Sequence, residues 1–171
     1  MKIPERTKSS KKGLVEFCDY ILSKHETKDL TILEVGSWTG CSAEIFAKIF
    51  KTVICVDPWT PTKEINTEYN MRKVESKFDN IKKKYDNIIK LKKTSEEAAK
   101  IIESVDIVYI DGLHNYEDCK KDLQFWLNKC RKFISGHDYW PERFDGVIRA
   151  VNEMVGIPDK IFPDTSWIKK I

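Results

Sequence analysis

Two short blocks in the second half of the chain combine carboxylate and imidazole side chains. Asp111-Gly112-Leu113-His114 follows one apolar run, and Gly136-His137-Asp138 follows another. A histidine titrates in the range useful for a general base, and two carboxylates with an imidazole can hold a divalent cation. Each residue also has a structural alternative, such as ending a strand or packing at the start of a helix. The expected catalytic residues are Asp111, His114, His137 and Asp138, with Asp111 and Asp138 as the expected metal ligands.

A glycine-containing turn in the first half of the chain has the features of a nucleoside site. Gly36-Ser37-Trp38-Thr39-Gly40 follows a short apolar run and leads into a helical pattern. Such a junction exposes backbone N–H groups and lets a ligand approach the glycine backbone. A dinucleotide fold requires glycine where this chain has Trp38, and the chain has no Gly-Lys-Ser/Thr motif of a P-loop. The turn therefore favours a nucleoside cofactor without a phosphate to cradle.

Asp57 ends the next apolar run, a little over twenty residues after the glycine strand. An acid at this place can accept hydrogen bonds from both ribose hydroxyls of a nucleoside. The alternative is a turn residue before Pro58, and the upstream glycine turn favours the ribose role.

The elements that must position these residues alternate between apolar strands and amphipathic helices. Strands are expected at 32–35, 53–56, 88–91, 107–110 and 132–135, with helices between them and a hairpin at 160–168. We predict an α/β fold: a doubly wound Rossmann-like sheet, mostly parallel with an antiparallel C-terminal hairpin. Residues 1–171 are expected to form a single domain whose ligand binds beyond the carboxyl ends of the strands.

Several local features of the helices are also predicted. Ser95, Asn115 and Asp145 are expected to cap helices. The apolar stripe after Ser95 should include Ile101, and Trp126 falls on the apolar stripe of its own helix.

Composition excludes several classes of protein. Hydrophobic residues make up 41% and charged residues 33% of the chain, which is ordinary for a globular domain. No apolar run approaches the ~20 residues that span a bilayer, and residues 1–12 lack an apolar signal-peptide core, so a cytoplasmic location without a membrane is expected. The net charge of +3 does not by itself imply nucleic acid. Scattered, odd-numbered cysteines argue against a disulfide framework and a structural zinc site: Cys18, Cys41, Cys55, Cys119 and Cys130.

Over residues 30–155 the sequence resembles one family. Glu34-x-Gly36-x-x-x-Gly40 resembles the first motif of class I S-adenosylmethionine-dependent methyltransferases. The block from Tyr109 to Glu117 is similar to the small-molecule O-methyltransferase and cephalosporin-hydroxylase-like branch, which has an Asp-Gly-x-His-x-Tyr sequence after its fourth strand. The later residues of this pattern are Asp122-Leu123, Trp126, Gly136-His137-Asp138-Tyr139 and Gly146-Val147.

The resemblance implies S-adenosylmethionine as the cofactor and methyl transfer to a hydroxyl group as the reaction. The backbone near Gly36 would contact the methionine part, and residues after the third strand would approach adenine. The implied cofactor-binding residues are Glu34, Gly36, Ser37, Trp38, Gly40, Asp57, Thr94, Ser95 and Asp111. Related macrocin-type enzymes are thought to use a divalent cation, Mg²⁺ or Mn²⁺, but they carry two adjacent acids where this chain has His137-Asp138.

The partner is expected to be a small molecule. Trp59, Tyr139, Trp140 and Phe144 could wall an acceptor pocket or simply pack, whereas Trp126 and Trp167 are assigned to the core. Further walls could come from the 59–69 loop, the N-terminal segment or the second subunit of a homodimer. Two alternatives stay open: a nucleic-acid methyltransferase, which the lack of an Asn/Asp-Pro-Pro-Tyr/Phe-like block disfavours, and a cofactor-binding domain without turnover.

Overall fold

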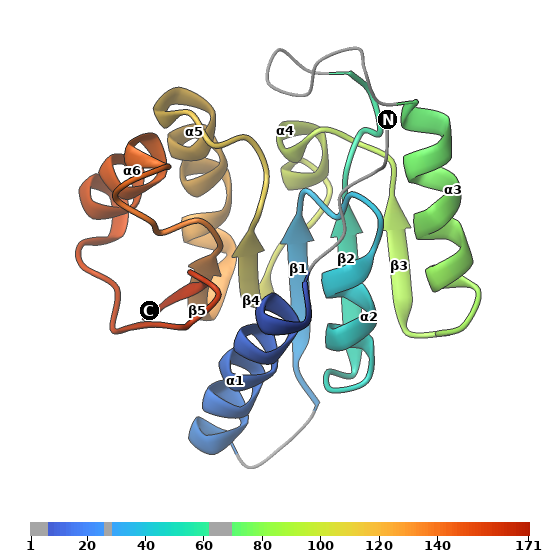
Figure 1. The fold of residues 1–171 in the computed structure, drawn as a ribbon, viewed down its shortest axis with the longest axis horizontal. Coiled ribbons are helices and arrows are strands. Elements are labelled where there is room, and N and C mark those ends of the chain that lie inside the picture. The colour runs from blue at the N-terminus through green and yellow to red at the C-terminus, as the bar shows by residue number, and fades with distance from the viewer. Residues whose placement is uncertain (1–6, 26–28, 62–69) are drawn as a thin grey trace.

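A seven-stranded sheet runs through the computed structural model, which describes residues 7–25, 29–61 and 70–171. The strand order is β3-β2-β1-β4-β5-β7-β6 (Figure 1). Strands β1 to β5 pair in parallel, and the C-terminal hairpin β6–β7 pairs antiparallel to β5. The strands are β1 (Thr31–Val35), β2 (Thr52–Val56), β3 (Ile88–Leu91), β4 (Val105–Ile110), β5 (Cys130–Gly136), β6 (Lys160–Ile161) and β7 (Trp167–Lys170). The predicted fold class is confirmed.

Strand order reverses between β1 and β4, because the chain runs outward from β1 to β3 and then returns to β4 on the other side of β1. In open α/β sheets the ligand binds at such a switch point, beyond the carboxyl ends of the strands. The turn after β1 and the residues after β4 therefore lie side by side, with the Asp111 N–H donating to the Val35 carbonyl at 2.9 Å.

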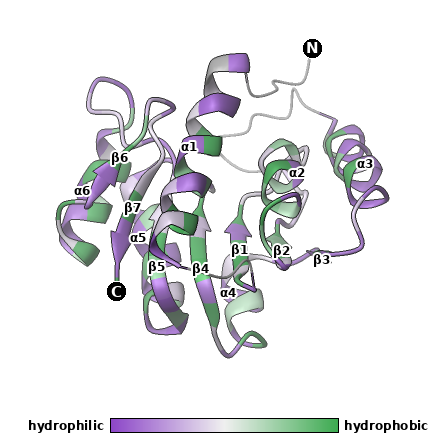
Figure 2. Ribbon diagram, turned by 90° about the horizontal axis from the view of Figure 1, so that it is seen from below, coloured by the Kyte–Doolittle hydropathy of each residue, from purple (hydrophilic) through white to green (hydrophobic). Residues whose placement is uncertain are grey.

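Helices cover both faces of the sheet in two apolar layers. One layer joins α1, α2 and α3 to sheet residues such as Ile32, and the other joins α4, α5 and α6 to residues such as Leu33. Successive residues of a strand face opposite sides of the sheet. Because helices cover both sides, the residues that face either side must be apolar. Figure 2 shows part of the result, since β4 in the middle of the sheet is largely hydrophobic. The helices are α1 (Lys8–Lys24), α2 (Cys41–Ala47), α3 (Met71–Lys82), α4 (Ser95–Ala99), α5 (Tyr116–Trp126) and α6 (Asp145–Val155), with a short 3₁₀ turn, η1 (Leu127–Lys129).

Helix α5 shows how the local sequence sets an element. Asn115 is its N-cap, and the Asn115 side chain accepts a hydrogen bond from the Asp118 N–H at 3.0 Å. Its apolar face buries Trp126 completely, as predicted. Trp167 on β7 is also in the core, as predicted.

Three local predictions are wrong. Thr94, not Ser95, caps α4, because the Thr94 hydroxyl and the Glu97 side chain form a reciprocal capping box. Ile101 is 56% exposed, since α4 ends at Ala99 and the chain turns away from the sheet. Phe144 is the N-cap residue of α6, and Asp145 is its first helical residue, where a carboxylate still suits the helix dipole.

None of the described helices has the length and hydropathy needed to cross a membrane. Most of the predicted 59–69 loop, residues 62–69, lies outside the described residues.

Candidate active site

A cavity of about 910 Å³ opens at the carboxyl ends of the strands. This volume falls within the usual range for small-molecule and cofactor sites. Most of the residues predicted from the sequence line it: Gly36, Ser37, Trp38, Asp57, Thr94, Ser95, Asp111, His114, His137 and Asp138. The fold thus brings the nucleoside-type turn and the His/Asp blocks into one site.

The turn after β1 exposes backbone to the cavity. Gly36 has a positive φ of 88°, and the Gly36 N–H donates to the Val56 carbonyl at 2.8 Å, which joins the turn to the end of β2. Ser37 is buried, and its Oγ has no hydrogen-bond partner of normal geometry among the described residues, although the Cys55 thiol lies near it. A buried hydroxyl on a cavity wall is suited to a ligand that supplies the missing partner.

Asp57 offers an acceptor to the same cavity. Each of its carboxylate oxygens accepts one backbone N–H, from Trp38 at 2.9 Å and from Trp59 at 2.6 Å. Burial raises the pKa of Asp57, and the two N–H donors partly offset that effect. A carboxylate has about four acceptor positions, so two remain for the hydroxyls of a ribose.

Two predicted cofactor residues do not line the cavity. Glu34 is completely buried behind the turn, where it accepts hydrogen bonds from the Ser42 hydroxyl and, at 3.9 Å, the Cys55 thiol. Gly40 starts α2 in a left-handed conformation with φ 83°. Both residues support the turn in this structure, and direct binding by them stays a prediction.

The start of α4 forms another part of the wall. Thr94 is engaged in its capping box, and the Ser95 Oγ accepts the Trp126 indole N–H at 2.8 Å. Because both side chains already form hydrogen bonds within the protein, a ligand here would meet mainly the backbone of this segment.

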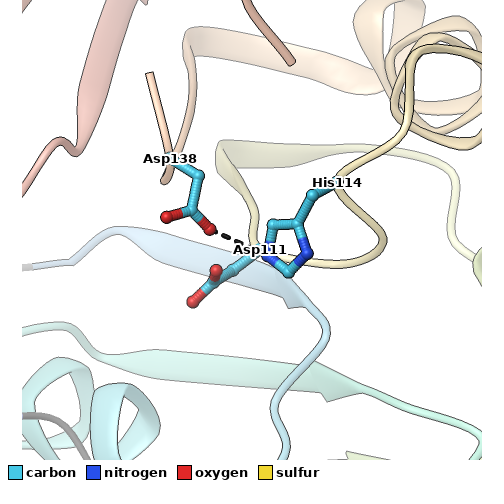
Figure 3. A group of neighbouring side chains, drawn as sticks. All are labelled: Asp111, His114 and Asp138. Atoms are coloured by element: carbon cyan, nitrogen blue, oxygen red, sulfur yellow. Dashed lines mark ion pairs between the residues drawn. The ribbon is translucent and has the colours of Figure 1, made fainter. Parts of the chain in front are cut away.

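Asp111, His114 and Asp138 converge from the ends of β4 and β5 (Figure 3). His114 Nε2 lies 2.8 Å from Asp138 Oδ2, and one potential ligand atom from each of the three residues lies within 4.8 Å of the others. The strands are adjacent because Ile110 pairs with Gly136. Two carboxylates and an imidazole form a donor set that suits Mn²⁺ and, less well, Mg²⁺.

His137 joins the cluster through both aspartates. Its Nδ1 lies 3.0 Å from Asp138 Oδ1 and 3.7 Å from Asp111 Oδ1, and its Nε2 lies 3.9 Å from Asp164 Oδ2. Burial opposes ionisation of Asp138, but hydrogen bonds from His114 and His137 outweigh it and hold the pKa of Asp138 well below its usual range. Asp138 is therefore a carboxylate at neutral pH.

Sequence reasoning missed several residues of the cavity wall. Asp122 is the most distinctive, a buried carboxyl on the apolar face of α5. The sequence signal for it is a charged residue on an apolar helical stripe, three residues after Cys119 and four before Trp126. Others that were missed are Lys93, Asp118, Lys121, Phe125 and Arg143.

The four aromatic residues proposed for an acceptor pocket have different environments. Trp59 is buried against Phe78, with ring centroids 4.7 Å apart. Phe144 stacks on the His114 ring at 4.8 Å, which places it at the cluster. Tyr139 donates its hydroxyl to Asn152 on α6, and Trp140 is 40% exposed.

Comparison with solved structures supports the fold. An O-methyltransferase from Bacillus cereus in complex with SAH is 13% identical, with a TM-score of 0.58 over 97% of this chain and 90% of that one. A Klebsiella pneumoniae protein described as an O-methyltransferase is 15% identical, with a TM-score of 0.65 over 97% and 81% of the two chains. The fibrillarin pre-rRNA processing protein of Methanococcus jannaschii is 16% identical, with a TM-score of 0.56 over 85% and 67%. Identities this low establish the fold alone.

Comparison with curated proteins finds no match. A family model described as a methyltransferase domain matches residues 33–139. The match covers well over half of the chain and runs from β1 through the turn, Asp57 and the Asp111 block to His137 and Asp138. The chain therefore belongs to this methyltransferase domain family.

Proposed function

We propose that this protein transfers the methyl group of S-adenosylmethionine to a hydroxyl group of a small-molecule acceptor. One observation carries the proposal: a single cavity is lined both by the first turn with Asp57 and by Asp111, His114 and Asp138. Methyl transfer depends mainly on alignment, so donor and acceptor must share one enclosed site. Membership in the methyltransferase domain family supports the reaction class.

The first turn and Asp57 are proposed to hold the cofactor. The remaining acceptor positions of Asp57 suit a ribose diol, and the buried Ser37 hydroxyl suits a polar group of the ligand. S-adenosylmethionine supplies an electrophilic methyl group on a sulfonium. The absence of a phosphate in this cofactor is consistent with Trp38 occupying a place that dinucleotide folds give to glycine.

The His/Asp cluster is proposed to activate the acceptor. Asp138 is ionised and hydrogen-bonded to His114, so the pair can take the proton that the acceptor hydroxyl loses as its oxygen bonds to the methyl carbon. The sulfur keeps the electron pair of the broken bond. His137 contacts both Asp111 and Asp138, and it is proposed to orient these carboxylates.

A divalent cation is a second part of the proposal. Asp111, His114 and Asp138 would hold it, and a bound cation lowers the pKa of a coordinated hydroxyl. In the metal-free version, the 2.8 Å contact between His114 Nε2 and Asp138 Oδ2 is a hydrogen bond within the cluster. The metal and metal-free versions use the same residues.

The test has two stages, of which the first is calorimetric titration with S-adenosylhomocysteine. Wild type is expected to bind in the micromolar range, and Asp57→Ala to bind about 100-fold more weakly, because two charge-assisted hydrogen bonds are lost. Asp145→Ala, whose side chain is 74% exposed, is the matched control and should bind like wild type. Wild type that binds no S-adenosylhomocysteine would overturn the proposal.

The second stage is a turnover assay with a panel of hydroxyl and amine acceptors, with and without Mn²⁺, Mg²⁺ or EDTA. His114→Ala and Asp138→Asn should lower the rate by roughly 10²-fold or more while cofactor binding persists. A turnover rate that falls when EDTA is added would support the version of the mechanism that uses a metal. Cofactor binding without any turnover would favour a non-catalytic domain, and RNA binding that falls steeply with salt would favour a nucleic-acid acceptor.

A further inference from the structure

Trp59 is tied to the cofactor side of the site although its ring does not line the cavity. The side chain is 3% exposed and packs on Phe78, and Lys90 Nζ lies 4.7 Å from the ring centroid on the indole face. These contacts alone would make Trp59 a packing residue between α3 and β3. Its hydrogen bonds indicate a second role.

Three hydrogen bonds join Trp59, Asp57 and Trp38 in a closed cycle. The Trp59 backbone N–H donates to Asp57 Oδ1 at 2.6 Å, and the Trp38 backbone N–H donates to Asp57 Oδ2 at 2.9 Å. The Trp59 indole N–H then donates to the Trp38 carbonyl at 2.8 Å. The cycle connects the turn after β1 to the end of β2, so neither can shift without the other.

Both tryptophans hold an uncommon backbone conformation. Trp38 has φ 46° and Trp59 has φ 47°, values in the left-handed region that bulky residues rarely adopt. Such strain persists only where surrounding interactions enforce it, and it is concentrated at functional sites. Here the enforcing interactions include the hydrogen bonds to one buried carboxylate.

We propose that Trp59 is a positioning residue that fixes the Asp57 carboxylate, through the Trp38 turn, for the ribose of the nucleoside cofactor. With one acceptor position of each oxygen taken by a backbone N–H, the remaining positions are held in one orientation before the ligand arrives. A ligand then binds without first ordering the carboxylate, which improves affinity. The inference rests on the proposed function, since it requires that S-adenosylmethionine occupies this cavity.

The test measures the affinity for S-adenosylhomocysteine of Trp59→Phe, which keeps an aromatic ring but loses the indole donor. The control is Trp167→Phe, because Trp167 is equally buried but its Nε1 has no hydrogen-bond partner among the described residues. Trp59→Phe should bind about tenfold more weakly, as expected when one hydrogen bond and its ordering are lost, and Trp167→Phe within about twofold of wild type. Equal affinities for the two variants would overturn the inference.

A double-mutant cycle separates positioning from packing. If Trp59 acts through Asp57, Trp59→Phe should cost about twofold or less in an Asp57→Ala background. A full tenfold loss in that background would show that the effect is independent of the carboxylate and would overturn the inference.

Replacing Trp59 with β-(3-benzothienyl)alanine covers the case in which Trp59→Phe does not fold. Sulfur takes the place of the indole N–H in this analogue, while the bicyclic shape is kept. The same tenfold weakening is expected, and wild-type affinity would contradict the role of the donor. Failure of the wild type to bind S-adenosylhomocysteine is a different result, and it would count against the proposed function itself.

Discussion

Asp122 places a carboxyl group in an otherwise apolar layer. The residue lies on the buried face of α5 and lines the cavity, where its carboxyl is hydrogen-bonded to Ser95. Burial raises the pKa of Asp122 to about 6, the Ser95 hydrogen bond partly offsets this, and the Asp118 charge adds to it. A group of this kind makes the folded state sensitive to pH.

The first prediction concerns Asp122→Asn and stability. The carboxyl is protonated in both states below its ordinary pKa of 3.8, but between that value and about 6 only the folded state keeps the proton. Wild-type stability should therefore fall as pH rises through this window, by about 3 kcal/mol relative to Asp122→Asn. Urea unfolding of both proteins from pH 4 to 7 measures the difference. For the exposed control Asp86→Asn, the difference in unfolding free energy from wild type should change little between pH 4 and 7. The same behaviour for Asp122→Asn would contradict the prediction.

At the scale of elements, the turn between β1 and α2 must bring two backbones unusually close. A Cβ at Gly36 would lie 2.1 Å from the Asp111 carbonyl oxygen, and Gly36 also has a positive φ of 88°. Gly40, at the other end of the turn, shares the positive φ, but a Cβ there would meet side-chain atoms, the Phe78 ring at 3.1 Å and Ile81 Cβ at 3.4 Å. Gly36 is therefore required by the approach of β4 to β1, whether or not a ligand is bound.

Alanine substitutions should separate these two glycines. Gly36→Ala should lower the free energy of unfolding by about 4 kcal/mol or more, because a backbone carbonyl cannot move aside as a side chain can. Gly40→Ala should cost about 1–2 kcal/mol, mainly for the left-handed conformation. Chemical denaturation of both variants measures the two losses of unfolding free energy. Equal losses would show that the left-handed backbone conformation alone sets the cost, without the contact at Gly36.

At the scale of the whole molecule, α1 and the C-terminal hairpin meet on one face of the sheet. Phe17 on α1 packs against Phe162 with ring centroids 5.5 Å apart. The buried Asp164 accepts the Ser166 hydroxyl at 3.0 Å, and Ser166 Oγ lies 2.7 Å from the Tyr109 hydroxyl on β4. Since Asp164 also faces His137, the contact between the two ends of the chain supports the His/Asp cluster from behind.

Gly13→Ala tests this contact. In a solvent-exposed helix the change would add roughly 0.5–1 kcal/mol of stability. Here the new Cβ would lie 2.6 Å from Asp164 Cβ and 2.7 Å from its backbone nitrogen, so a net loss of about 2 kcal/mol is expected. Thermal and urea unfolding measure it, with the exposed Lys11→Ala expected to stay within ±0.5 kcal/mol of wild type. A stabilised Gly13→Ala would mean that α1 and Asp164 are not closely packed.

The amino-acid sequence alone predicts the order of strands and helices, the carboxyl ends of β1, β2, β3 and β4, and the placement of Trp126 and Trp167 in the core. These depend on hydrophobic periodicity and on turn residues, which act over a few positions and are visible in the chain. It also predicted that the glycine turn and the His/Asp blocks share one site, because parallel strands end at a common edge. In the structure, most of these residues line the same cavity.

Contacts in the folded structure determine which of several suitable residues takes each role. Thr94 and Ser95 are both good caps, and Thr94 takes the role because its side chain forms the capping box with Glu97. Trp59 could wall a pocket or pack, and its contacts with Phe78 and Trp38 put it behind the site. Asp122 reaches the cavity wall because α5 packs beside α4. These outcomes depend on contacts between residues far apart in the chain, and no local pattern of the sequence records such contacts.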